Sequence, residues 1–125
     1  MNKDKREVLT QAYQKLATQV EAFDNALTML RETRAEELKA GKGGVLQMVT
    51  DGTSGVLFLA DTMRHTEDVH GIEVSLAFIR EQFGEIAAGL ADEDYVLVAD
   101  VLEFELMPML CEWFDELDAM FGDEE

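Results

Sequence analysis

The residues best suited to metal or acid–base chemistry are the two histidines of the chain and the acidic residues beside them. Glu67-Asp68-Val69-His70 has the Glu-x-x-His spacing, and a di-metal carboxylate bundle needs such a motif on each of two helices. His65 is the only other histidine, so no second motif can form on another helix. Both histidines fall at an expected link between helices, where solvated polar turns are typical. We predict no metal site and no cofactor, with Glu67, His65 and His70 as weak metal candidates.

A second candidate for acid–base chemistry is the pair Asp100 and Glu103, which interrupts an otherwise apolar stretch. The two residues are three apart and share a helical face. A catalytic role would need burial to raise one pKa, a cleft and a second catalytic group, and the sequence identifies no such group. The favoured alternative is a solvated helix edge, or ion pairs with cations of the first helix: Lys15, Arg31 or Arg34. We therefore predict that the chain is not an enzyme.

The charge of the chain limits its partners. The formal net charge is -17, from 27 acidic and 10 basic residues, and from Asp92 onward there are thirteen Asp or Glu and no Lys or Arg. Such a surface repels nucleic acid and anionic lipid, so we expect neither as a partner. It attracts a basic protein segment. Charge alone also leaves open an inhibitor that mimics DNA.

Four segments repeat apolar residues at alternating steps of four and three, as on one face of an α-helix. The expected helices span residues 5–40, 45–67, 71–90 and from 92–94 to near the end. Short links between them predict an all-α, antiparallel four-helix bundle in one domain, residues 1–125. The sequence Asp51-Gly52-Thr53-Ser54-Gly55 also fits a turn, in which case there are five helices. If the helix is continuous, its small residues allow close approach of a neighbouring helix.

The last helix is apolar on more than one face, so it is either central or one side of an interface. Pro108 removes a backbone hydrogen bond and predicts a kink over residues 104–108. One flank carries apolar side chains and the other faces carry carboxylates, which together are the candidate partner-binding residues: Met107, Phe114 and Phe121 with Glu112, Asp115 and Asp118. The alternative is that the apolar three simply pack against the first helix.

The stretch from Leu90 to Leu117 resembles the C-terminal part of a family of small, acidic, uncharacterised helical proteins of Gram-positive bacteria. The features that carry the resemblance are Asp94-Tyr95, the Asp100–Leu106 core, Pro108 and Glu112-Trp113. The resemblance implies a helical fold and no known activity.

These patterns favour a non-catalytic protein-binding module, an acidic adaptor or chaperone-like protein that engages a basic or amphipathic segment. The partner is another protein or a second copy of the chain, which would form a homodimer through the last helix. A metal-dependent or hydrolytic enzyme that uses His65, His70 and nearby carboxylates is the main alternative. The start of the chain shows no apolar signal core and no apolar run suited to a membrane span, so we expect a cytoplasmic protein. Cys111 is expected to pack as a small apolar residue.

Overall fold

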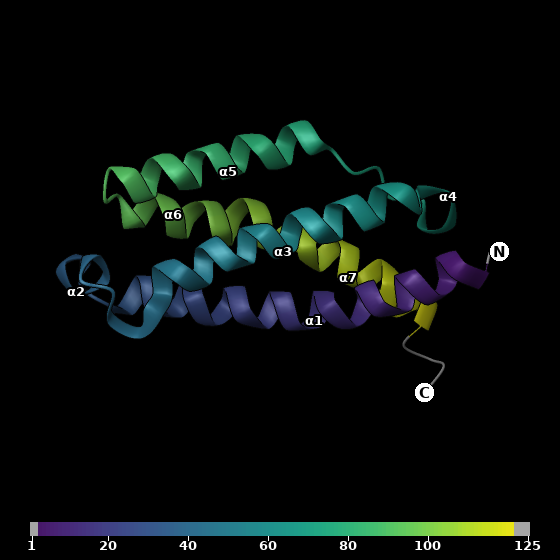
Figure 1. The fold of residues 1–125 in the computed structure, drawn as a ribbon, viewed down its shortest axis with the longest axis horizontal. Coiled ribbons are helices and arrows are strands. Elements are labelled where there is room, and N and C mark those ends of the chain that lie inside the picture. The colour runs from purple at the N-terminus through teal and green to yellow at the C-terminus, as the bar shows by residue number, and fades with distance from the viewer. Residues whose placement is uncertain (1–2, 122–125) are drawn as a thin grey trace.

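The computed structural model describes residues 3–121, and this part of the chain is helical with no strand. Four long helical stretches run antiparallel in chain order, so the start of the first and the end of the last lie at the same end of the bundle (Figure 1). The all-α prediction is confirmed. The four stretches are α1 (Lys3–Glu32), α3 (Val45–His65), α5 (Leu76–Ala91), and a last stretch of α6 (Tyr95–Val101), η2 (Leu102–Leu106) and α7 (Met107–Phe121).

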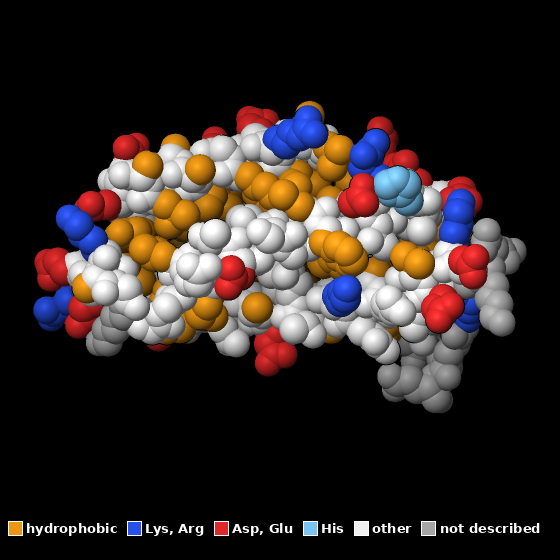
Figure 2. Space-filling view, viewed as in Figure 1, with side chains coloured by type: hydrophobic (Ala, Val, Ile, Leu, Met, Phe, Trp, Pro, Cys, Tyr) orange, Lys and Arg blue, Asp and Glu red, His pale blue; other side chains and the backbone are white. Residues whose placement is uncertain are grey.

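The core lies where the predicted apolar stripes of these helices meet. One flank of α1 packs on α3 and the other on α7, while α5 covers α6. Each fully buried Leu or Phe contributes about 1.5–3 kcal/mol relative to an exposed one. Figure 2 shows apolar side chains gathered in the seams on both sides of α3, toward α5 and toward α1. The buried core includes Leu9, Leu16, Phe23, Val49, Val56, Met63, Ile79, Ile86, Leu102, Leu110, Trp113 and Leu117.

The first helix ends earlier than predicted. A single helix was expected to reach about Ala40, but α1 stops at Glu32 and a short helix, α2 (Ala35–Lys39), follows. Arg34 between them is extended, with φ -65° and ψ 146°. This change of direction turns α2 at the end of the bundle and buries Leu38, which is 1% exposed. The burial of Leu38 therefore outweighs the helix propensity of the connecting residues.

The second helix, α3, is continuous through Asp51–Gly55, so the alternative with a break there is wrong. It follows a short 3-10 turn, η1 (Lys42–Gly44). A Cβ added at Gly52 would lie 2.8 Å from Cζ of the buried Phe23 ring, and one at Gly55 would lie 3.3 Å from Cδ of Gln19. Glycine costs each helical position about 1 kcal/mol relative to alanine. The close packing of α1 on α3 offsets that cost, as expected for small residues in a continuous helix.

The third long helix begins later than predicted, at Leu76 rather than near Gly71. A short helix, α4 (Glu67–His70), comes first and ends at Gly71, whose φ of 75° is the left-handed conformation that glycine adopts easily. The next residues form an extended link. The Ser75 side chain then accepts a hydrogen bond from the Phe78 backbone N–H at 3.1 Å, which caps the start of α5.

The last helical stretch begins where the acidic turn predicted, with Asp94 accepting a hydrogen bond from the Leu97 backbone N–H at 3.1 Å. It continues past Pro108, and the disturbance takes the form of one π-helical turn, η2. In this turn the Met107 N–H donates to the Leu102 carbonyl, five residues back rather than four. The wider turn lies directly before the proline, whose ring would otherwise clash with the carbonyl four residues earlier.

Candidate functional site

The predicted apolar partner-binding residues of α7 mostly pack within the molecule. Phe121 is 5% exposed and Met107 is partly buried against the core. Phe114 stacks on Tyr13 of α1, with ring centroids 5.2 Å apart, and the Phe121 ring lies 6.1 Å from the same tyrosine. The Arg6 guanidinium carbon lies 5.3 Å from the centre of the Phe121 ring. Phe121 is therefore part of the α1–α7 contact, and its side chain offers little surface to a partner.

The predicted acidic residues divide between the same contact and the open surface. The Tyr13 hydroxyl donates a hydrogen bond to Asp118, so this carboxylate also helps to hold α7 against α1. Glu112 and Asp115 are exposed and make no ion pair within residues 3–121. Of the predicted set, Phe114, Glu112 and Asp115 remain available to a partner.

A pocket of about 190 Å³ opens between α1 and α7, and we call it the α1–α7 pocket. Its walls are mostly apolar and it is lined by Ala17, Val20, Cys111, Phe114 and Asp115. Cys111 is exposed here, so the expectation that it packs as a small apolar residue is wrong. The partly exposed ring of Phe114 thus has one face on Tyr13 and borders a hollow at the surface. The pocket can accept one apolar side chain beside a carboxylate.

The surface of η2 and α7 next to the pocket carries a run of exposed carboxylates. Glu105, Glu112 and Glu116 follow one another at steps of seven and four, so they share one face of the helix. None of them, nor Asp115, has an ion-pair partner among the described residues. We call Glu105, Glu112, Asp115 and Glu116 the acidic face. Positive groups on a partner would find there four charges that the molecule leaves uncompensated.

The Asp100 and Glu103 side chains are used differently, because both bind Arg31 of α1. The Arg31 Nη2 atom lies 2.9 Å from Asp100 Oδ1 and 3.3 Å from Glu103 Oε2. The hydrogen bond to Asp100, with the charge of Glu103, raises the pKa of Arg31. The predicted ion pairing with the first helix is confirmed, with Arg31 as the partner. These carboxylates hold the last helical stretch on α1.

His70 is buried, at 6% exposed, which corrects the expectation of a solvated turn residue. Its Nδ1 accepts a hydrogen bond from the Ile72 N–H at 2.9 Å, so that nitrogen carries no proton. Its Nε2 then carries the proton and donates to the Met63 carbonyl at 2.8 Å. Both nitrogens are engaged with the backbone, and the ring holds the link after α4 against α3.

The other weak metal candidates each have a backbone contact of their own. His65 is exposed and its Nδ1 is 2.7 Å from the Asp61 carbonyl oxygen, while Glu67 accepts a hydrogen bond from the Val74 N–H at 3.1 Å. Within the described residues, no group of three or more His, Cys, Asp or Glu side chains is placed to hold a metal ion. The Glu-x-x-His motif here orders a loop.

An ion pair at the same end of the bundle joins the start of α1 to α4. Lys5 Nζ donates to both carboxylate oxygens of Asp68, at 3.0 and 2.8 Å. This hydrogen bond lowers the pKa of Asp68 below its ordinary value. The pair is exposed, so it orients α4 more than it stabilises the fold.

Comparison with known families gives one result for this helical chain. Residues 7–116 match the family model described as Domain of unknown function (DUF8042). The chain belongs to this family. Comparison with curated proteins and with solved structures finds no significant match. The DUF8042 match includes every residue of the α1–α7 pocket.

Among the described residues of this DUF8042 chain, no helix has the length and apolar character needed to cross a membrane.

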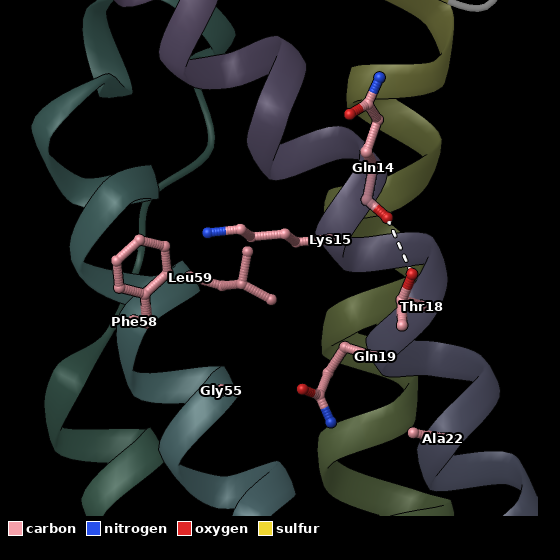
Figure 3. A pocket seen from close by; sticks show the side chains of 8 residues that line it. All are labelled: Gln14, Lys15, Thr18, Gln19, Ala22, Gly55, Phe58 and Leu59. Carbon is pink, nitrogen blue, oxygen red and sulfur yellow. Dashed lines mark hydrogen bonds between the residues drawn. The ribbon is translucent and has the colours of Figure 1, made fainter.

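Two exposed aromatic residues of the DUF8042 fold were missed as candidates from the sequence. Phe104 is 62% exposed in the π turn, one residue before Glu105 of the acidic face. Phe58 is 56% exposed on α3 and borders a groove between α1 and α3, where the Lys15 side chain extends toward it (Figure 3). Both fall inside apolar runs of the sequence, so periodicity alone did not show which side of each helix meets solvent.

Proposed function

We propose that this chain is a non-catalytic protein-binding module that engages a basic amphipathic segment of another protein. The observation that carries the proposal is the α1–α7 pocket, an apolar hollow directly beside the acidic face. The pocket takes one apolar side chain of the segment against Phe114. Basic side chains one helical turn away on the segment then meet Asp115, Glu112 and Glu116.

The two parts of this surface have different physical roles. An apolar anchor in a small pocket supplies most of the affinity, because it removes apolar surface from water. The carboxylates attract and select basic segments, and their contribution falls as salt increases. A segment that lacks either the anchor or the positive charges would bind weakly.

We propose a cytoplasmic adaptor or chaperone-like protein, of Gram-positive origin as the sequence pattern suggests. A basic partner is favoured over a homodimer, because two copies at -17 each repel one another.

The test is a calorimetric titration of the protein with a synthetic amphipathic helix. This helix has about 18 residues, a leucine stripe and a lysine-rich polar face. Ala17→Leu fills the pocket from an exposed position without removing a packing contact. Ala87→Leu, at an exposed position on α5, is the matched control. We expect saturable binding that weakens with salt, with Ala17→Leu weaker and Ala87→Leu unchanged. Equal binding by the two variants would show that the pocket is not the anchor site.

A further inference from the structure

A continuous groove runs along the seam between α1 and α3, on the flank of α1 away from the α1–α7 pocket. Its central section encloses about 420 Å³ (Figure 3). The section continues in one direction past Met48 and Asp51, and in the other past Val8 to Asp61 and His65. We call the whole feature the α1–α3 groove. No residue that lines it also lines the α1–α7 pocket.

The α1–α3 groove exists because small side chains face each other across the seam. Ala22 and Thr18 on α1 leave the central section open, while the Gln19 side chain lies against Gly55 on α3. Larger apolar side chains along the groove stay in contact with water: Phe58 beside the central section is 56% exposed, and Val8 farther along is 44% exposed. Exposed aromatic groups next to an unfilled apolar hollow are typical of surfaces that bind another protein.

Charge is sparse in the central section and its sign is unusual for this molecule. Lys15 is the one ionisable side chain among the eight residues that line the section. Its Nζ lies 4.2 Å from the centre of the Phe58 ring and pairs with no carboxylate in the described part of the chain. One end of the groove carries Asp51, and the other carries Asp61 together with Asp4, Lys5 and His65. Lys15 is therefore the single charge of the central section, with a carboxylate toward each end of the groove.

We propose that the α1–α3 groove docks an amphipathic helix of a partner protein, with an acidic residue of that helix set against Lys15. The α1 residues that line the groove run from Asp4 to Ala22, which is about 27 Å of helix and suits a ligand of about five turns. The open groove between two helices suits the helix-in-groove mode of recognition. Small apolar side chains of the ligand fill the central section, and its basic ends meet Asp51 at one end of the groove and Asp61 at the other.

This site goes beyond the proposed function, because it uses other residues and selects the opposite charge at its centre. A molecule with both sites would hold two different segments on the two flanks of α1. A second copy of this chain is a poorer occupant, since its net charge of -17 opposes close approach.

Two synthetic helices test the proposal by chemical-shift mapping on the isotope-labelled full chain. Both have about 18 residues, an alanine and leucine stripe and lysines at each end, and they differ only in a central glutamate or lysine. We expect the glutamate helix to bind more tightly and to shift the amide signals of Val8, Phe58 and Thr62. Lys15→Glu should weaken that helix about tenfold and strengthen the lysine helix, since each tenfold change is about 1.4 kcal/mol.

Arg80→Glu, an exposed position on α5, changes the net charge by the same amount and serves as the control. Equal effects of the two variants would overturn the proposal, because the preference would then reflect overall charge. It would also be overturned if neither helix shifted the groove signals. Concentration-dependent shifts at the groove without any added helix would assign it to a second copy instead. Ala17→Leu should leave binding at this groove unchanged, so failure here and failure of the proposed function are distinguishable.

Discussion

Phe114 of α7 stacks on Tyr13 of α1, with the ring planes inclined by 26°. The same tyrosine donates a hydrogen bond to Asp118 and lies beside Phe121. One residue of α1 thus contacts three residues on the inner side of α7. The neighbouring turn of each helix, at Ala17 and Cys111, is left open as the α1–α7 pocket. Side chains that hold α7 in place and side chains free to meet a partner therefore alternate along the same helix.

Phe121→Ala should destabilise the protein by about 3 kcal/mol, because it removes a buried aromatic ring from the α1–α7 contact. The exposed Phe104 is the matched control, and Phe104→Ala should change the free energy of unfolding by less than about 0.5 kcal/mol. Urea unfolding followed by circular dichroism measures both. A similarly small decrease in the free energy of unfolding in both variants would contradict the packing role of Phe121.

Gly52→Ala should destabilise the protein by about 1–2 kcal/mol, although alanine is the better helix former. The added methyl group would collide with the buried Phe23 ring, and this overpacking exceeds the gain in helix propensity. Gly84 on α5 has no neighbour within 4 Å of an added Cβ, so Gly84→Ala should instead stabilise by up to about 1 kcal/mol. Opposite signs in denaturant unfolding are the expected result. Stabilisation by both substitutions would show that α1 and α3 are not in close contact at Gly52.

Periodicity was enough to predict the long helices, because each buried stripe keeps its spacing of three and four along the chain. The acidic start of the last helix and the ion pairs of Asp100 and Glu103 followed from local chemistry and from charge imbalance. The break at Arg34 could not be predicted in this way, because the sequence around Arg34 favours a helix. What ends α1 there is the burial of Leu38 in the core, which the local sequence does not show.

The candidate site was harder to predict, because a helix with several apolar faces does not reveal which neighbour covers each face. Phe114 and Phe121 share a flank in the sequence pattern, yet only the position of Tyr13 shows that both contact α1. The α1–α3 groove was equally hidden, since it depends on which residues of α1 and α3 meet across the seam between the two helices.

His70→Ala should cost about 1–3 kcal/mol of stability, because it removes the acceptor for the Ile72 N–H and the donor to the Met63 carbonyl. His65→Ala, at an exposed position, should cost less than about 0.5 kcal/mol. Thermal unfolding with and without added zinc checks both variants. A zinc-dependent rise in the melting temperature that either substitution abolishes would instead support the metal alternative.

The carboxyl group of Asp68 should titrate below the ordinary aspartate value of ~3.9, because Lys5 hydrogen-bonds its ionised form. The pair stabilises the folded state above that ordinary pKa, and this contribution is lost as the pH falls through the lowered pKa of Asp68. Carbon-detected NMR titration measures the shift directly. Lys5→Met should raise the pKa of Asp68 toward its ordinary value. Lys15→Met, which removes a lysine that pairs with no carboxylate, should leave it unchanged.

The most direct test of the protein-binding account compares two pairs of charge reversals in titrations with the same lysine-rich amphipathic helix. Glu112→Lys with Asp115→Lys changes the acidic face, while Glu81→Lys with Glu85→Lys changes exposed positions on α5 by the same net charge. The account predicts that the first pair weakens binding about tenfold or more and the second by less than about twofold. Equal weakening by both pairs, or binding that neither pair alters, would contradict it.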